Sequence, residues 1–208
     1  QWILFSDRID GSQITTQKQL KRYADVILSA SLLILTSPLT LIAGLLIKLE
    51  DGGPIFFRQQ RSGLLGQPFE ILKLRTMAPS ASAEGAMWSA PNDQRITTVG
   101  RLLRKVRIDE LPQLINVLRG EMSLIGPRPE QPELEFSLEN NIPNYRLRHW
   151  IRPGISGWAQ VNMPYASNLN DAELKLSYDL YYLRNGSVWL DLLILFKTIK
   201  VVLKAAGR

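Results

Sequence analysis

An uncharged run of 22 residues at positions 26–47 constrains the fold of this chain more than any other feature. An α-helix rises about 1.5 Å per residue, so this run would be about 33 Å long. The apolar core of a bilayer is about 30 Å thick, and the run is long enough to cross it. A core helix of a soluble protein is rarely this long and this apolar. The run therefore predicts a helix that enters a membrane.

Ser37 and Pro38 lie in the middle of this run. Proline removes one internal hydrogen bond and kinks a helix, and the Ser37 hydroxyl can satisfy the freed backbone group. Each half would then measure about 17 Å, which is about half the bilayer depth. Basic residues, which favour the cytoplasmic side, flank both ends: Lys18, Lys21, Arg22, Lys48, Arg58 and Arg61. Two arrangements fit this pattern, a helix that dips in and returns to the same face and a kinked helix that spans.

The charge balance of the chain indicates an anionic partner. Its 208 residues include 25 Lys and Arg against 19 Asp and Glu, which gives a net charge of +6. Such a surface suits nucleic acid, a phosphorylated substrate or a membrane. The sequence contains no recognised nucleic-acid motif, so nucleic acid is not expected as a partner. The chain has no cysteine, which excludes disulfides and thiolate metal sites.

Short strands are expected after the apolar run. Residues 51–54 read Asp-Gly-Gly-Pro and end the helix. Residues 55–60 and 69–75 surround a Gly-rich turn, and the strand-like character of both segments predicts a β-hairpin. The hairpin would bring four cations near one another: Arg58, Arg61, Lys73 and Arg75. A loop rich in Ala, Ser, Gly and Pro follows over residues 78–92.

Helical patterns dominate the rest of the chain. Thr97 or Thr98 can cap the first of them. Further helical segments are expected over residues 111–118, 130–147, 171–184 and 189–203. The expected fold is therefore mainly α with a small β-hairpin, an α+β arrangement.

The last of these helices is very apolar and begins at Trp189. Lys197, Lys200 and Lys204 recur at helical spacing and share one face. This pattern fits an amphipathic helix at the membrane interface. It fits a terminal helix packed on the protein's own core equally well.

Two adjacent carboxylates, Asp109 and Glu110, lie between a basic segment and an apolar helical pattern. The basic residues are Arg101, Arg104, Lys105 and Arg107. Acidic residues are common at helix starts, where they bind free N–H groups and suit the helix dipole. The pair therefore fits a helix start, and a catalytic role needs support from the rest of the chain.

Two stiff loops each carry an arginine. In Gly126-Pro127-Arg128-Pro129, two prolines restrict the backbone around Arg128. A guanidinium that is already positioned loses little entropy on binding, so Arg128 is either a phosphate clamp or a plain surface arginine. The second loop, over residues 152–162, begins with Arg152. The single histidine, His149, is expected at the surface or packed, rather than in catalysis.

Seven short motifs follow one another through nearly the whole chain. They are Lys21-Arg22-Tyr23-Ala24-Asp25, Ser37-Pro38, the stretch from Pro54 to Gly63, Lys73-Leu74-Arg75-Thr76-Met77, Asp109-Glu110-Leu111-Pro112-Gln113, Gly126-Pro127-Arg128-Pro129 and the stretch from Arg152 to Asn162. Each motif alone is weak, but their order is highly specific. By these motifs the chain resembles the bacterial monotopic phosphoglycosyl transferases over about residues 18–208. Met163 departs from the family's usual Gly, which affects local loop geometry.

The resemblance implies a fold and a location. Residues 18–208 would form the catalytic domain, and residues 1–17 a linker from an upstream domain, as in large members of the family. The helix over about residues 23–49 would be re-entrant and broken at Ser37-Pro38. The protein would be monotopic, with interfacial amphipathic helices, at the cytoplasmic face of the bacterial inner membrane.

The resemblance also implies an activity. Similar proteins transfer a sugar-1-phosphate from a nucleotide diphosphate sugar, here a UDP-hexose, to polyprenyl phosphate and release UMP. This is the first membrane step of polysaccharide or glycoconjugate assembly, as in exopolysaccharide and lipopolysaccharide biosynthesis. Carried over, Asp109 is the nucleophile, Glu110 is its acidic partner, and both hold Mg²⁺. Arg58, Arg75, Arg128 and Arg152 would bind substrate phosphates. Homo-oligomerisation stays open.

Two other classes of function compete with this one. A glycosyl transferase that moves the sugar without its phosphate would release nucleoside diphosphate instead of monophosphate. A basic membrane scaffold or nucleic-acid binder is supported by net charge alone.

Overall fold

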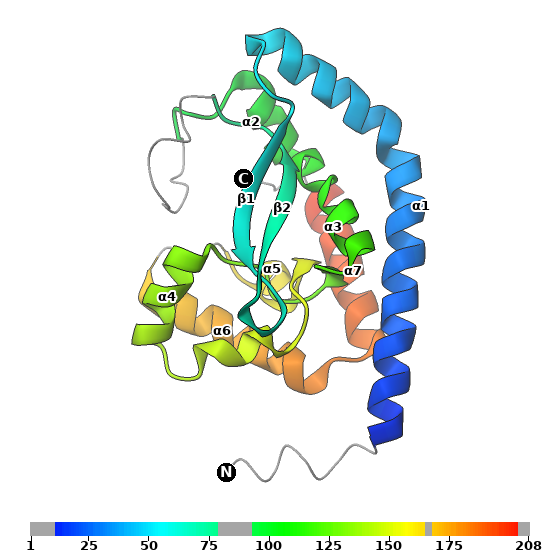
Figure 1. The fold of residues 1–208 in the computed structure, drawn as a ribbon, viewed down its shortest axis with the longest axis vertical. Helices are drawn as coiled ribbons and strands as arrows, with labels where there is room; N and C mark the ends of the chain where they lie inside the picture. The colour runs from blue at the N-terminus through cyan, green and yellow to red at the C-terminus, as the bar shows by residue number, and fades with distance from the viewer. Residues whose placement is uncertain (1–10, 79–92, 165–167, 204–208) are drawn as a thin grey trace.

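The computed structural model describes residues 11–78, 93–164 and 168–203, with side chains described for 18–78, 93–164 and 168–202. These residues form helices, a β-hairpin and a second sheet of two short strands. One long helix, α1, runs along the edge of a body built from the shorter elements (Figure 1). The predicted fold, mainly α with a small β-hairpin, is confirmed. The loop expected over residues 78–92 lies outside the described residues from position 79 on.

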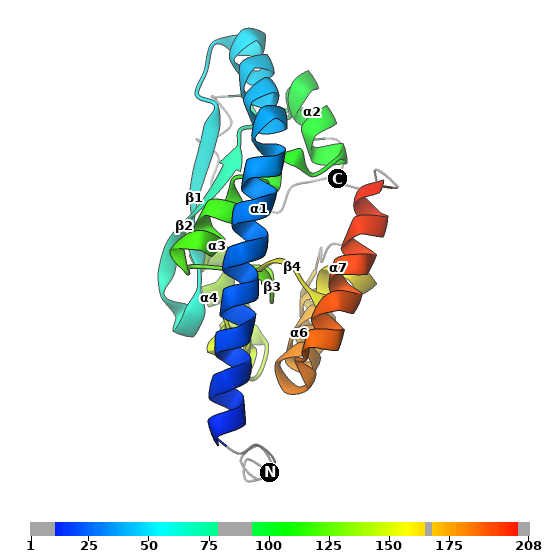
Figure 2. The same cartoon turned by 90° about the vertical axis from the view of Figure 1, so that its right-hand side faces the viewer.

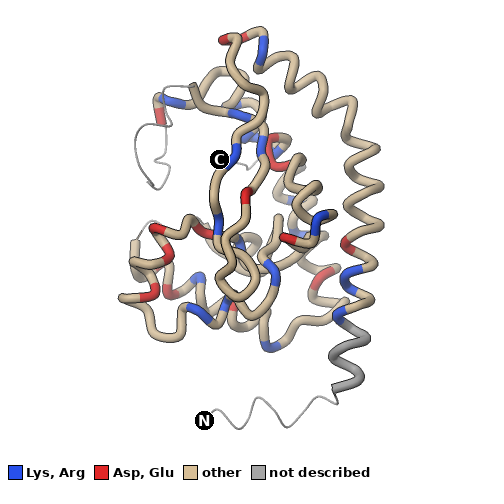
Figure 3. The backbone as a smooth tube through the Cα atoms, in the orientation of Figure 1, with Lys and Arg blue, Asp and Glu red and all other residues tan. Residues whose placement is uncertain are grey.

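Helix α1 (Gly11–Asp51) contains the apolar run. Its segment Lys18–Asp51 is long and apolar enough to cross a membrane, with a mean hydropathy of 2.1 over its most apolar window. Only 11% of that window is buried. Figure 3 shows charged residues near the two ends of the described part of α1 and none along its middle. Since α1 begins at Gly11, the helix includes the end of the segment predicted as a linker.

Helix α1 bends at its middle without interruption (Figure 1). In a regular helix, the N–H of residue 38 would donate to the Ile34 carbonyl. Pro38 has no N–H, and the Ser37 hydroxyl donates to that carbonyl instead, at 2.8 Å. A break was predicted at this point, whereas α1 is bent but continuous. The Ser37 side chain supplies the hydrogen bond that Pro38 cannot, so the helix is not interrupted.

The two ends of α1 are fixed to different parts of the body. Near the start, Arg22 donates to the carbonyls of Val117 and Leu118 at 2.6 and 2.9 Å. At the far end, Asp51 forms an ion pair with Arg75. Between these anchors the helix exposes large apolar side chains, which are Ile27, Leu28, Leu32, Ile34, Leu35, Leu39, Leu41, Ile42, Leu45 and Leu46. This surface is available to lipid.

The hairpin pairs β1 (Phe56–Ser62) with β2 (Pro68–Leu74) in antiparallel register. A 3-10 turn, η2 (Leu64–Gly66), joins them, with Leu65 in the left-handed region at φ 54°. Arg61 lies opposite Phe69 and Arg58 opposite Leu72. Because strand side chains alternate between faces, Arg58 points away from Arg61 and Lys73. The prediction that the four cations of the hairpin lie near one another was therefore wrong for Arg58. Arg75 instead forms an ion pair with Asp51.

The middle of the chain forms short elements around the core. They are α2 (Thr98–Lys105), η4 (Ile108–Glu110), α3 (Gln113–Arg119), β3 (Ser123–Ile125), α4 (Pro132–Asn141), η5 (Tyr145–Trp150), β4 (Gly154–Ser156) and α5 (Trp158–Asn162). Thr97 caps α2 by accepting from the N–H of Gly100, as predicted. Figure 2 shows α1 lying across the side of α3.

Strands β3 and β4 pair in parallel, Ser123 with Gly154 and Ile125 with Ser156. Strand β4 lies in the loop that was expected over residues 152–162, and no element had been predicted for β3. A Cβ atom on Gly154 would lie 2.1 Å from the nitrogen of Gly126, so only glycine permits this approach. The two Pro/Gly loops are thus packed backbone to backbone.

The last two helices, α6 (Leu169–Asn185) and α7 (Val188–Leu203), complete the body. Ile194 of α7 is fully buried, whereas Trp189 and Phe196 are 81% and 69% exposed. The helix thus packs on the core with one face and offers an apolar face to its surroundings. Lys197 lies over the Trp158 ring at 4.7 Å, and Lys204 lies outside the described residues. The core cluster consists of Phe69, Ile71, Leu114, Val117, Met122, Leu124, Ile125, Tyr182 and Ile194.

Candidate active site

Asp109 and Glu110 lie in a tight turn between α2 and α3. Arg107 adopts the left-handed conformation at φ 56° and directs the chain into η4. Both carboxylates are 8% exposed, and neither caps a helix, since Pro112 precedes α3 with no side-chain bond. The pair is therefore not a helix cap, and its burial needs another explanation.

Glu110 is surrounded by cations from three segments. Its carboxylate lies 2.5 Å from Arg128 Nη2, 3.3 Å from Lys73 Nζ and 3.5 Å from Arg107 Nη1. Burial alone would raise the pKa of Glu110, but Arg128 and Lys73 hold it well below its usual range. Glu110 is thus a permanent anion at neutral pH.

Asp109 has a different environment from its neighbour. Among the described residues, its carboxylate forms no hydrogen bond or ion pair that would occupy an oxygen. Burial, together with the charge of Glu110, raises the pKa of Asp109 to about 6, although Lys73, Arg104 and Arg128 act against this shift. Asp109 is therefore mainly ionised at neutral pH, with oxygens available for attack or for a cation.

The loop that carries Arg128 is held by its carbonyl groups. Two of its residues are prolines and lack an N–H, so the carbonyls are the main groups available. Four consecutive carbonyls accept hydrogen bonds from different parts of the fold: Pro127 from the N–H of Gly154, Arg128 from Arg148, Pro129 from Arg61, and Glu130 from the N–H of Ser62. These bonds fix the backbone from which the Arg128 side chain reaches Glu110.

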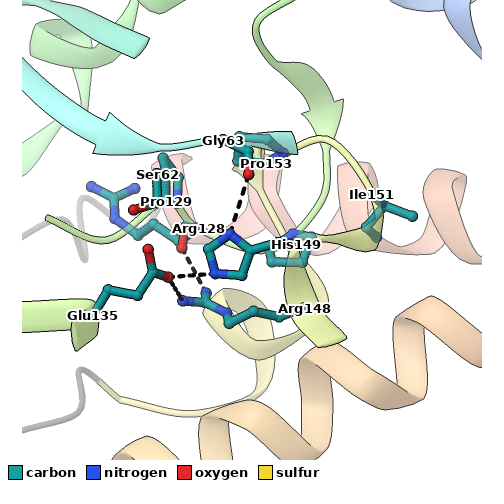
Figure 4. A pocket seen from close by; sticks show the side chains of 10 residues that line it. Ser62, Gly63, Arg128, Pro129, Glu135, Arg148, His149, Ile151 and Pro153 are labelled. Atoms are coloured by element: carbon teal, nitrogen blue, oxygen red, sulfur yellow. Dashed lines mark hydrogen bonds and ion pairs between the residues drawn. The ribbon is translucent and has the colours of Figure 1, made fainter. Parts of the chain in front are cut away.

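Beneath this loop lies a buried network centred on Arg148 (Figure 4). The Arg148 guanidinium donates to the Arg128 carbonyl at 2.7 Å and pairs with Asp179 at 2.9 Å. Glu135 lies 3.7 Å away. His149 joins the network, with Nε2 2.6 Å from Glu135 and Nδ1 3.2 Å from the Gly63 carbonyl. Of the two placements expected for His149, at the surface or packed, the structure has the packed one.

The structure does not bring all the predicted arginines to the carboxylate pair. Arg58 is exposed and pairs with Glu70 on the outer face of the hairpin. Arg75 binds Asp51 and the carbonyls of Pro54 and Met77. Arg152 donates to the Gly120 carbonyl, just past the end of α3 that lies away from Glu110. Within the described part of the chain, only Arg128 of the four contacts Glu110.

Comparison with known proteins gives the family. Residues 16–205 match the bacterial sugar transferase family. The chain belongs to that family. Three relatives illustrate its range. A UDP-N-acetylgalactosamine-undecaprenyl-phosphate N-acetylgalactosaminephosphotransferase of Aeromonas hydrophila is 47% identical over 188 residues, which is 90% of this chain and 44% of the relative.

Two further relatives match a larger part of their own length. A UDP-glucose:undecaprenyl-phosphate glucose-1-phosphate transferase of Caulobacter vibrioides is 45% identical, covering 88% of this chain and 69% of that protein. The sugar transferase EpsL of Bacillus subtilis is 42% identical, covering 90% and 89%. The chain spans less than half the length of several curated relatives that it matches.

Sequence reasoning missed several groups at the site. Lys73 and Arg107 contact Glu110, and Gln113 is buried close by, but none had been assigned a role. One signal was present for Lys73: strand alternation places it on the same face as Phe69 and Ile71, which are buried. A lysine on a buried face needs an anionic partner, and Glu110 is that partner.

The oxygen donors of the Asp109–Glu110 pair fit Mg²⁺. Magnesium takes oxygen ligands, commonly one or two carboxylates completed by water and phosphate. Within the described ranges no side chain or backbone N–H donates to the Asp109 carboxylate, and Glu110 follows it directly. The described residues contain no group of three or more acidic, His or Cys side chains placed to hold a metal. Asp109 and Glu110 would thus hold the ion together with oxygens from water and substrate.

Proposed function

We propose that this chain transfers a sugar-1-phosphate from a nucleotide diphosphate sugar to polyprenyl phosphate at a membrane surface. The observation that carries the proposal is the buried Asp109 carboxylate, which accepts no hydrogen bond from any described residue and lies beside a cluster of cations. The exposed apolar surface of α1 supports the membrane location. The names of the relatives support the substrate classes, UDP-sugars and undecaprenyl phosphate.

In the first step, an Asp109 oxygen attacks the β-phosphorus of the nucleotide sugar. A bond forms between aspartate and phosphorus, and the bond from phosphorus to the bridging oxygen breaks. The nucleoside monophosphate leaves with that oxygen. A covalent intermediate divides a reaction between two anionic substrates into two displacements, so both phosphates need not be assembled at once.

In the second step, a phosphate oxygen of the polyprenyl phosphate attacks the same phosphorus. The bond to Asp109 breaks, the carboxylate is regenerated, and the product is a polyprenyl diphosphate sugar. The phosphoryl group carries negative charge throughout, so cations must accompany it. Lys73 and Arg128 lie beside the pair and supply that charge. Mg²⁺, held by Asp109 and Glu110, would add charge neutralisation at the phosphate oxygens.

We infer that α1 dips into the membrane and returns to the same side. Its start is bonded to α3 through Arg22, and its end to the hairpin through Asp51 and Arg75. A spanning helix would place its two ends on opposite sides of the bilayer. If α1 spanned the bilayer, the single folded body that binds both of its ends could not lie on one side of the membrane. The bend at Pro38 allows each half to enter only part of the bilayer depth.

The arrangement of α1 can be tested by cysteine labelling, because the chain contains no cysteine. Gln19→Cys lies before the apolar run and Gln60→Cys lies after it, and both positions are exposed. We expect both cysteines to be protected from an impermeant maleimide in intact cells and to react in inside-out vesicles. Labelling of one position from each side would contradict the dipping helix. Detergent-solubilised protein, in which both must react, is the control.

The nucleotide product separates this function from that of a glycosyl transferase. UDP-glucose and UDP-N-acetylgalactosamine, the donors named in the relatives, are the first substrates to supply. Incubated with undecaprenyl phosphate and Mg²⁺, the protein should release UMP in proportion to lipid-linked sugar. Release of UDP would show that the sugar moves without its phosphate and would reject the proposal.

A further inference from the structure

We propose that Gln113, with Arg61 and Lys73, forms a phosphate-binding seat in a small cavity between the hairpin and α3. This inference rests on the proposed function and adds residues to its site. The ligand class is a phosphate group, which is carried by both the nucleotide sugar and the polyprenyl phosphate.

The walls of the cavity are mainly cationic. They come from β1, β2, α3 and the Arg128 loop, and the lining residues are Arg61, Ile71, Lys73, Gln113, Arg128 and Pro129. Three of these six side chains are basic and none is acidic. A cavity lined in this way favours an anion.

Two polar groups that line the cavity are left unsatisfied, and one of them belongs to Gln113. Gln113 is 1% exposed, and its Nε2 has no hydrogen-bond partner among the residues that the structure describes. Arg61 Nε is also buried, and no described residue accepts a hydrogen bond from it. A buried donor without an acceptor costs stability, so native structures rarely keep one without a reason. Both unsatisfied atoms are hydrogen-bond donors, so a ligand that satisfies them must carry hydrogen-bond acceptors.

The charges around the cavity favour phosphate among possible anions. Burial lowers the pKa of Arg61 to about 10, so its guanidinium stays protonated at neutral pH, and the Lys73 amine lies 3.3 Å from the Glu110 carboxylate. The nearest anion to Lys73 is Glu110, which is shared with Arg128 and Arg107. A phosphate offers several acceptor oxygens in different directions, which suits donors arriving from three elements.

The seat lies beside the proposed nucleophile. Lys73 contacts Glu110 directly, and Gln113 follows Asp109 by four residues across the short turn that leads into α3. A phosphate held there lies next to the carboxylate pair. Gln113 would thus bind an oxygen of the reacting phosphate or of the phosphate adjoining it.

Gln113→Leu tests the phosphate-binding seat with inorganic pyrophosphate as the probe, so the natural ligand need not be known. The substitution removes the unsatisfied donor and keeps an apolar side chain of similar size. We expect the melting temperature of the ligand-free protein in nanodiscs to rise by about 2–4 °C. Binding of inorganic pyrophosphate, followed by calorimetry, should weaken about tenfold or more. Gln60→Leu, exposed on the outer face of β1, should change neither quantity.

A structural role for Gln113 predicts the opposite pattern. If Gln113→Leu lowers the melting temperature and leaves pyrophosphate affinity unchanged, the seat is overturned. Two further assays identify the source of the phosphate. Loss of covalent labelling by UDP-sugar without lipid assigns the seat to the nucleotide sugar. Normal labelling with a raised KM for undecaprenyl phosphate assigns it to the lipid. Both results support a phosphate seat.

Failure of the seat and failure of the proposed function are distinguishable. If the native chain transfers sugar phosphate while Gln113→Leu leaves pyrophosphate binding and both steps unchanged, only the seat is rejected. If the native chain forms no product but pyrophosphate binding still depends on Gln113, the proposed function is rejected and the seat stands.

Discussion

Asp109→Asn should reduce sugar-phosphate transfer by at least about four orders of magnitude, while the protein stays folded. An amide is a poor nucleophile, so the covalent route is lost, whereas substrate binding through Arg128 and Lys73 remains. Turnover is measured as UMP released with undecaprenyl phosphate as acceptor. Asp171→Asn, at the start of α6, is the matched control and should retain the native rate.

The same variant makes a prediction about stability. The pKa of Asp109 in the folded protein, about 6, lies above its usual value of 3.8. The stability that this group contributes is therefore complete below about pH 4 and is lost as the pH rises through 6. Asp109→Asn removes the buried charge, so its melting temperature should equal or exceed that of the native protein at pH 8. Native turnover by this variant would remove Asp109 from the nucleophile role.

Arg148→Met should be the most destabilising substitution in the described part of the site. It removes the cation that pairs with Asp179 and leaves this buried carboxylate, together with nearby Glu135, without its charge partner. Breaking a buried pair from one side costs about 3–5 kcal/mol. For a chain of this size, this corresponds to a melting temperature lower by about 6–20 °C.

Arg146→Met is the control for this comparison. Arg146 lies two residues earlier, is 82% exposed and pairs with Glu139 at the surface. Exposed pairs contribute little, so this variant should melt within a few degrees of the native protein. If the two variants are equally stable, the Arg148 network does not support the Arg128 loop energetically. Arg148→Lys, which keeps the charge but not the fork of donors, should fall between them.

Some of this architecture could be predicted from short-range pattern. The apolar run at 26–47, the Pro38 position and the alternating strands of the hairpin are local signals, and the structure contains the corresponding elements. The parallel pairing of β3 with β4 could not be predicted in the same way. Each strand has three residues, which is too short for a periodicity, and the partners lie about thirty residues apart.

The composition of the site shows a similar limit. Asp109 and Glu110 stood out as adjacent carboxylates between a basic segment and an apolar helical pattern, and Arg128 stood out as a cation in a stiff loop. Arg75 carries the same charge in a matching motif, but Asp51 engages its guanidinium. Lys73 and Gln113 join the site only through the register of β2 and the packing of α3. Which cation meets which carboxylate is decided by tertiary packing, and a charge pattern alone does not encode it.

The central claim is that Asp109 carries the sugar phosphate between two half-reactions. The most direct test is intact-mass spectrometry of the protein incubated with UDP-sugar and Mg²⁺ in the absence of polyprenyl phosphate. We predict a mass increase of one sugar phosphate, located on Asp109 by peptide mapping, with one UMP released for each modified chain. A chain that stays unmodified here, yet produces lipid-linked sugar phosphate at its full rate once undecaprenyl phosphate is added, would contradict the covalent mechanism.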